Sequence, residues 1–248
     1  AETSEKVVRS NSLDEPLTPT VFNIKSPSTK GSTAVAAVKV DTSGLFVRNN
    51  RLFQLEFNGG AFDYETKDLT SFIPEIGGAG FVRLAVQRYP DTRIHGVKAD
   101  GTAAILIFDP NEDMKCWIDI ETDGLIEDII VKPAASSAIE DSVYYIIKRT
   151  INGSVVRYRE KMSLESECVG GTQNKQADSF VSGTQTSSTT ITGLGHLEGE
   201  SVIVWADGIN YSPRVNGAQT TFTVTSGAIT LPSAVVSYVV GLPYSARY

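Results

Sequence analysis

The sequence predicts an all-β protein: propeller-like antiparallel blades, incomplete in number, followed by a small β-sandwich or barrel domain. Three observations predict this class. Windows of a dozen residues rarely keep the apolar spacing of a helix without an interrupting Gly, Pro or β-branched residue. Short apolar runs separated by turn residues recur along the chain. Three hairpins among them repeat at intervals of about fifty residues, which is typical of one propeller blade.

The three predicted hairpins turn at pairs of residues that tolerate positive φ: Asn49-Asn50, Asp100-Gly101 and Asn152-Gly153. Between the second and third hairpins, the sequence predicts a strand carrying Trp117, a turn at Asp123-Gly124 and a strand over 126–131. With these strands, each period of about fifty residues contains about four strands, as one propeller blade requires. At most three periods are visible, and fewer than four blades rarely close into a propeller.

The composition shifts at Glu165, where residues 165–189 are rich in Gly, Ser, Thr, Gln and Asn and are typical of an exposed connector. Short strands with turns at roughly ten-residue spacing follow, which indicates a small β-sandwich or barrel. We therefore expect blades over 1–165, a connector over 166–178 and the small domain over 179–248.

The chain has 248 residues, with 22 Lys and Arg against 29 Asp and Glu and a net charge of -7. Surfaces that bind nucleic acid through its phosphates cluster positive charge, so this balance argues against such a surface, and we expect no base readout. The nearest approach to a basic patch is formed by Arg149, Arg157, Arg159 and Lys161. A solvated strand face is the favoured interpretation of these residues.

The two cysteines, Cys116 and Cys168, lack the spacing of a zinc site or a CxxC redox motif, and one bridge between them stays open. The first residues lack the apolar segment of a secretory signal. Prolines interrupt the most apolar run, 229–246, which is too short to span a bilayer. We therefore expect no membrane anchor.

Within TGLGHLEGESVIVWADG, residues 192–208, His196, Glu198 and Glu200 occupy every second position. On one strand all three would share a face, where they could bind a metal ion or transfer protons. Gly199 between the two carboxylates breaks that alternation, so a turn is the favoured interpretation. The strand proper is then predicted to begin at Ser201 and to end before a turn at 207–208.

A second candidate, DPNEDMKCWIDI, begins like a calcium loop with Asp109, Asn111 and Asp113 at alternate positions. Met114 then stands where the loop needs Gly, and Ile120 stands where it needs a bidentate Glu. A polar hairpin turn is therefore the favoured interpretation.

The other candidate motifs are weaker. GGAGF, residues 77–81, lacks the Lys-Ser/Thr of a P-loop and is interpreted as a flexible connection. His95 and His196 are too few for a typical zinc site, and no GxSxG elbow is present. The acidic pairs Glu127-Asp128 and Glu140-Asp141 are the only support for a glycosidase. We predict no catalytic, cofactor-binding or metal-binding residues and no cofactor.

Six stretches follow one another in order: LTPTVFNIKSPSTKGSTAVAAVKVDTSGLFVRNNRLFQLEF, DLTSFIPEI, VQRYPDTRIHGVKADGTAAILIFDP, YYIIKRTINGSVVRYREKM, GLGHLEGESVIVWADG and VVSYVVGLPY. As an ordered series, covering about Leu17 to Tyr244, they resemble a family of tailed-bacteriophage and prophage virion proteins. Members are described as tail-nozzle, stabilisation or tail-tube-associated proteins. Some carry a label for a domain like the first catalytic-cysteine half-domain of ubiquitin-activating enzymes.

The resemblance implies a particle component, located in the virion after synthesis in the bacterial cytoplasm, without known catalytic residues. Its expected partners are other tail or connector proteins and further copies of itself. The ubiquitin-enzyme label implies no activity, because no adenylate-binding motif is present and Cys168 has no evident activating group. Family members are usually longer, so we expect this chain to be a fragment, a processed product or an excised segment.

Two other functions stay open. A host-surface binding module would stack sugars on exposed aromatic residues such as Tyr89, Trp117 or Trp205, although burial in a blade core is the expected place for each. A polysaccharide hydrolase would use the acidic pairs.

Overall fold

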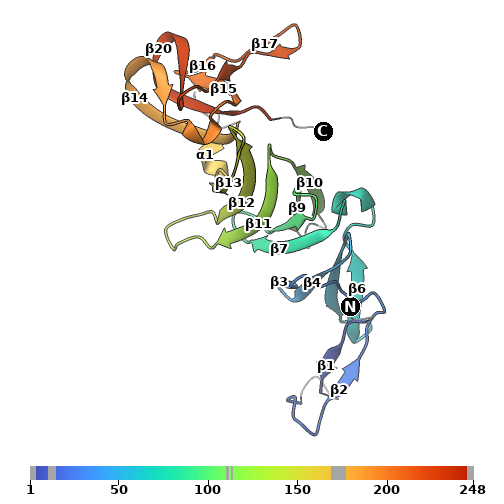
Figure 1. Ribbon diagram of the computed structural model, residues 1–248. Helices are drawn as coiled ribbons and strands as arrows, with labels where there is room; N and C mark the ends of the chain where they lie inside the picture. The colour runs from blue at the N-terminus through green and yellow to red at the C-terminus, as the bar shows by residue number, and fades with distance from the viewer. Residues whose placement is uncertain (1–3, 11–14, 110–111, 113, 169–176, 245–248) are drawn as a thin grey trace. The chain divides into compact units, whose positions relative to one another are not determined.

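The computed structural model describes residues 4–10, 15–109, 112, 114–168 and 177–244 (Figure 1). Its regular structure is almost entirely β, arranged in several antiparallel sheets, which confirms the predicted all-β class. Among the described residues, no helix has the length and apolar character needed to cross a membrane.

The chain folds into two compact units, 1–121 with 126–143 and 122–125 with 144–248. The second unit therefore takes in most of the third predicted hairpin as well as the C-terminal strands. The predicted connector, 166–178, also falls in this unit, and its residues 169–176 lie outside the described part of the chain.

The first unit contains two four-stranded antiparallel meanders, in which strands pair in sequence order. The first meander consists of β3 (Val38–Val40), β4 (Ser43–Arg48), β5 (Arg51–Asn58) and β6 (Asp63–Asp68). The second consists of β7 (Phe81–Gln87), β8 (Arg93–Lys98), β9 (Ala103–Asp109) and β10 (Met114–Ile120). The same unit holds a small sheet of β1 (Val7–Arg9) and β2 (Asn23–Lys25), the 3-10 helix η1 (Pro74–Gly77) and nearly all of β11 (Leu125–Lys132).

The predicted turns lie where the sequence indicates them. Asn49 joins β4 to β5 with a φ of 54°, and Gly101 lies between β8 and β9 with a φ of 83°. In the second unit, Asn152 has a φ of 47° between β12 (Ser142–Ile151) and β13 (Ser154–Lys161). Positive φ at these positions matches the right-handed twist of the flanking strands, which explains why Asn and Gly specify them.

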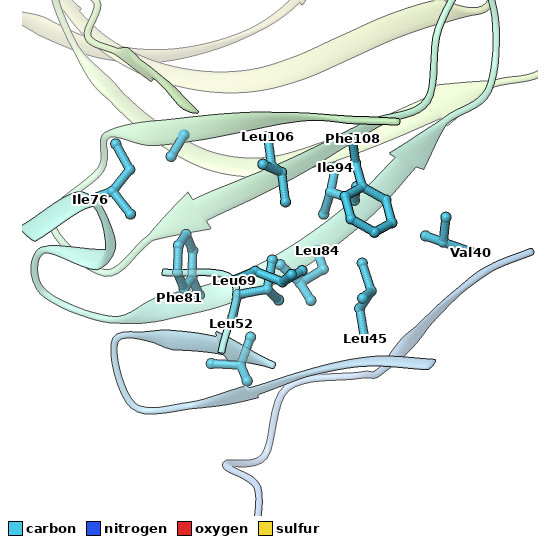
Figure 2. Packing of buried hydrophobic residues seen from close by; sticks show 12 residues of the cluster. Val40, Leu45, Leu52, Leu69, Ile76, Phe81, Leu84, Ile94, Leu106 and Phe108 are labelled. Carbon is cyan, nitrogen blue, oxygen red and sulfur yellow. The ribbon is translucent and has the colours of Figure 1, made fainter. Parts of the chain in front are cut away.

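Apolar side chains fill the space between the two meanders (Figure 2). Leu45 and Leu52 of the first meander lie opposite Ile94 and Leu106 of the second, and all four are almost completely buried. Each such side chain contributes roughly 1.5–3 kcal/mol by leaving water. Alternate residues of β9, from Ala104 to Phe108, and of β4, Leu45 and Val47, belong to this cluster, so both sheets share one core.

The GGAGF loop, interpreted above as a flexible connection, is packed against the first meander. A Cβ atom on Gly77 would lie only 1.8 Å from the carbonyl oxygen of Asn50. The N–H of Phe81 donates to the carbonyl of Asn49 at 3.3 Å, and Gly80 accepts from the N–H of Ala99 at 2.9 Å. The glycines therefore allow close approach of two backbones, and they do not form a phosphate loop.

The second unit is built around a sheet in the order β14-β20-β15-β16. Its elements after β13 are α1 (Glu165–Cys168), β14 (Asp178–Thr192), η2 (Gly195–Leu197), β15 (Ser201–Ala206), β16 (Ile209–Asn210), β17 (Arg214–Val215), β18 (Ala218–Gln219), β19 (Phe222–Thr223) and β20 (Ala228–Leu242). A second apolar core, which includes Leu194, Leu197 and Val204, lies in this unit.

Two expectations about local structure in this unit are wrong. About half of the 165–189 stretch, whose composition is typical of an exposed connector, forms β14, which overlaps the 166–178 connector only at Asp178. The apolar run around Pro232 forms one strand, β20, instead of two short ones. Each strand has 15 residues, and the two pair along their length with register shifts near Ser188 (Figure 1). Pro232 lies opposite that irregular stretch, where its missing N–H removes no regular ladder bond.

Candidate functional site

Strand β10 forms an edge of the second meander. It pairs with β9 over all seven of its residues without a register shift, and no other described strand pairs with it. The edge therefore presents a row of backbone N–H and C=O groups that another strand could meet.

One face of β10 is held by the core. The indole Nε1 of Trp117 donates to the carbonyl of Leu69 at 3.0 Å, and its ring stacks on Phe81 with centroids 6.2 Å apart. On the same face, Lys98 donates to the Asp119 carboxylate at 2.6 Å. Lys98 is buried and Asp119 is half exposed. These contacts fix the position of the strand against the core of the unit.

The other face of β10 carries an exposed apolar stripe of Met114, Cys116 and Ile118. Met114 is 45% exposed and Ile118 is 43% exposed. On the same face of the sheet, Ile105 of β9 and His95 of β8 are buried. The side chains on this face of the sheet are therefore buried on β8 and β9 but exposed on the edge strand β10.

The other three edges of the two meanders carry features that discourage pairing. Strand β3 has only three residues. Strand β6 reads DYETKD, and Lys67 on it pairs with Glu56 and Glu65. Strand β7 has a register irregularity after Phe81, and its Arg83 pairs with Asp128. Short length, charge and bulges are the usual protections of edge strands. Strand β10 has seven residues and no register irregularity, and its charges, Lys115 and Asp119, both lie on the face opposite its apolar stripe.

The His196, Glu198 and Glu200 trio does not form a ligand set. The Nε2 atom of His196 lies 3.0 Å from the carbonyl oxygen of Ser179. The carboxylate of Glu198 accepts the N–H groups of Ser226 at 2.8 Å and Gly227 at 2.6 Å. The turn interpretation is confirmed, because β15 begins at Ser201 and ends at Ala206, directly before the 207–208 turn.

The calcium-like segment contains the hairpin between β9 and β10. Asp109 ends β9 and pairs with Met114 across the turn, which confirms the hairpin. Asn111 and Asp113 lie outside the described residues. Among the residues that are described, no group of three or more His, Cys, Asp or Glu side chains is placed to hold a metal ion.

The carboxylate of Asp141 joins separate loops of the first unit. It accepts the N–H groups of Arg88 at 2.7 Å, Tyr89 at 3.2 Å and Ala134 at 2.8 Å. Burial alone would raise the pKa of Asp141, but these hydrogen bonds stabilise the charged form and lower it. A carboxylate engaged in this way is suited to bracing loops, so the pair Glu140-Asp141 gives little support to a hydrolase.

His95 is the most buried titratable group of the second meander. Its Nε2 atom lies 3.1 Å from the amide oxygen of Gln87, whose own amide donates to the carbonyl of Tyr89. Burial, with a smaller effect from the charge of Arg93, lowers the pKa of His95 from 6.5 to about 4. The imidazole is therefore neutral at physiological pH and acts as part of a buried polar chain.

The proposed solvated basic face is wrong for Arg149. This side chain is buried, and its guanidinium forms hydrogen bonds with both Glu160 carboxylate oxygens, at 2.8 and 2.9 Å, and an ion pair with Asp178 at 3.4 Å. Burial lowers the pKa of Arg149, but Glu160 and Asp178 outweigh it and raise the value. Strand alternation places Arg157, Arg159 and Lys161 on the opposite face of the β12–β13 hairpin.

The three aromatic candidates for sugar binding differ in how exposed they are in the structure. Trp117 packs against the core as expected, and Trp205 on β15 is partly buried. Tyr89 is 60% exposed, so its expected burial is wrong. The two cysteines, Cys116 and Cys168, are both free and exposed.

Comparison with models of protein families finds no matching family, and comparison with curated proteins finds no match. The resemblance to phage virion proteins therefore stays a prediction. The open β10 edge was missed by sequence reasoning. The apolar alternation MxCxI was visible, but alternation alone does not reveal which strand ends a sheet.

Proposed function

We propose that this chain is a structural component of a tailed-phage particle, in the tail or the head-to-tail region. It acts by protein-protein packing without catalysis, and its partners are further copies of itself and neighbouring tail or connector proteins. The ordered resemblance supports the class of particle. The open, apolar β10 edge is the observation that carries the mode of action, because such an edge is suited to pairing with another chain.

This proposal is tested by producing the complete gene product with its neighbouring virion proteins. Electron microscopy and light scattering should find this protein in ordered assemblies, with no enzymatic turnover required. Finding only inert monomers in the presence of every neighbour would contradict the proposal.

Tyr89 gives specific support to one alternative, a module that binds host-surface glycans. Its side chain is exposed, and Arg88 and Asp91 are close to it in the sequence. An aromatic face beside polar groups is suited to stacking on a sugar ring. A glycan array that shows binding by the native chain and its loss in Tyr89→Ala would favour this alternative, whereas an array without hits removes it.

A further inference from the structure

We propose that β10 pairs with β10 of a second copy, antiparallel and about a twofold axis at Trp117, so that two meanders join into one continuous sheet. This contact rests on the proposed function, the self-association of a particle component, and it names the surface that makes it. The argument uses the residue order of β10, its regular register and the exposure of its side chains.

The sequence of β10, MKCWIDI, is self-complementary when read antiparallel. With Trp117 opposite its own equivalent, all seven residues of each strand are paired. Lys115 then lies opposite Asp119 of the second copy, and Asp119, which keeps its contact with Lys98 of its own chain and is half exposed, lies opposite Lys115. Opposite charges at directly facing positions of an antiparallel pair are favourable, while like charges are unfavourable. Any shifted register loses paired residues and separates these charges.

The same register joins the two apolar stripes. Cys116 lies opposite Ile118 of the second copy, and Met114 lies opposite Ile120, all on one face of the joined sheet. Met114, Cys116 and Ile118 are exposed in the single chain, so pairing removes their apolar surface from water. The two faces therefore contribute differently: the core face supplies charge complementarity and the outer face supplies apolar contact.

A second copy fits this edge better than an unrelated partner, because the charge pattern of β10 is complementary to itself. A chain of net charge -7 gains little from general attraction between copies, so local charge pairing has to set the register. One seven-residue strand pair gives an interface below the roughly 1,200–2,000 Å² of stable complexes. We therefore expect a dimer that depends on concentration in solution and is strengthened where a particle holds copies close together.

Disulfide trapping tests the register. The full chain carries Cys168→Ser, to remove the other thiol, together with Ile118→Cys. The new thiol then lies opposite Cys116 of the second copy, within reach of a disulfide. Mild oxidation should yield a covalent dimer at least about tenfold faster than in the control variants, because pairing raises the effective concentration of the thiols.

Two controls are matched to this variant in the same Cys168→Ser background. Ile120→Cys places its thiol opposite Met114, out of register with Cys116. Glu65→Cys places a thiol on the charged edge strand β6. If either control forms the dimer as fast as Ile118→Cys, the proposed pairing is wrong.

Sedimentation of the unmodified chain over a concentration series provides a second readout. We expect reversible dimers in the unmodified chain and their loss in Ile118→Lys, which places a charge at an exposed position. Circular dichroism of this variant should match that of the unmodified chain, which shows that the substitution leaves the fold intact. A monomer at every concentration overturns the proposal. Such a result leaves the proposed function standing if the chain still enters assemblies with its neighbours. Conversely, trapping without assembly supports the contact and contradicts the function.

Discussion

The two meanders of the first unit share strand number, strand order and one core, yet they end in different ways. The first ends on β6, where Glu65 and Lys67 form ion pairs and charge covers the edge. The second ends on β10, where Met114 and Ile118 are exposed. The residues at the edge of a sheet decide whether it is protected from pairing with another chain. We therefore expect the two sheets to differ in self-association, although their core-facing residues build the same arrangement of strands.

The two sheets also differ inside. The buried polar pair of the first sheet, Gln54 and Ser43, forms a hydrogen bond of 2.9 Å between two side chains that do not titrate. The second sheet buries His95, whose charge depends on pH. As the pH falls, acid should therefore destabilise the first unit through His95 of the second sheet.

The largest expected effect comes from Gly77→Ala, at the point where the two sheets approach. The added Cβ would meet the Asn50 carbonyl oxygen at 1.8 Å, so one backbone has to move. We expect the free energy of unfolding to fall by about 3 kcal/mol, as for an overpacked core. Denaturant titration measures this, with Gly59→Ala as the control because its Cβ would meet nothing within 4 Å. Equal stability of the two variants would contradict the packing of the sheets.

The next effect concerns pH and the second sheet. His95 has a folded pKa of about 4, below its usual 6.5, so the unfolded chain binds a proton first as the pH falls. Its contribution to stability is complete above about pH 6.5 and is lost as the pH falls toward 4, by about 3 kcal/mol. In His95→Gln this part of the pH dependence should vanish. Parallel pH profiles of the native chain and the variant would contradict a buried neutral imidazole.

A smaller effect is expected from Trp117→Phe, which keeps an aromatic ring against Phe81 but removes the hydrogen bond to the Leu69 carbonyl. The loss should be about 1 kcal/mol in the free energy of unfolding. Because Trp117 also orients β10, the trapping rate of Ile118→Cys should fall in the combined variant. Unchanged stability would indicate that the indole N–H contributes nothing to holding the edge strand.

The smallest effect on stability, within about 1 kcal/mol, is expected when β6 is given the character of β10 by Glu65→Ile with Lys67→Ile. Exposed ion pairs contribute little, so the fold should persist. Self-association in sedimentation should nevertheless increase, because the edge loses its charge and gains an apolar stripe. If the double variant stays as monomeric as its parent, edge chemistry does not explain the difference between the sheets.

Local chemistry made several elements predictable. The turns at Asn49 and Asn152 and the start of β15 at Ser201 follow from residues whose backbone preference is strong wherever they occur. The turn interpretation of the His196 segment held for the same reason, since Gly199 with a φ of 82° excludes a regular strand there.

Features that depend on distant segments could not be predicted in this way. Ser and Thr residues of β14 resemble a connector until β20 pairs with them. Arg149 resembles its basic neighbours until Glu160 and Asp178 surround it, and Tyr89 carries no local signal of its exposure.

By itself, the sequence of this protein determined the all-β class, the hairpin turns and the alternation of apolar residues along the strands, because these depend on each residue and its immediate neighbours. Only the tertiary structure decided which strand ends each sheet, which charges are buried and which apolar stripe stays exposed. Those outcomes depend on pairing and packing between residues far apart in the chain, and the same alternating pattern describes a strand in the middle of a sheet and the open edge at β10.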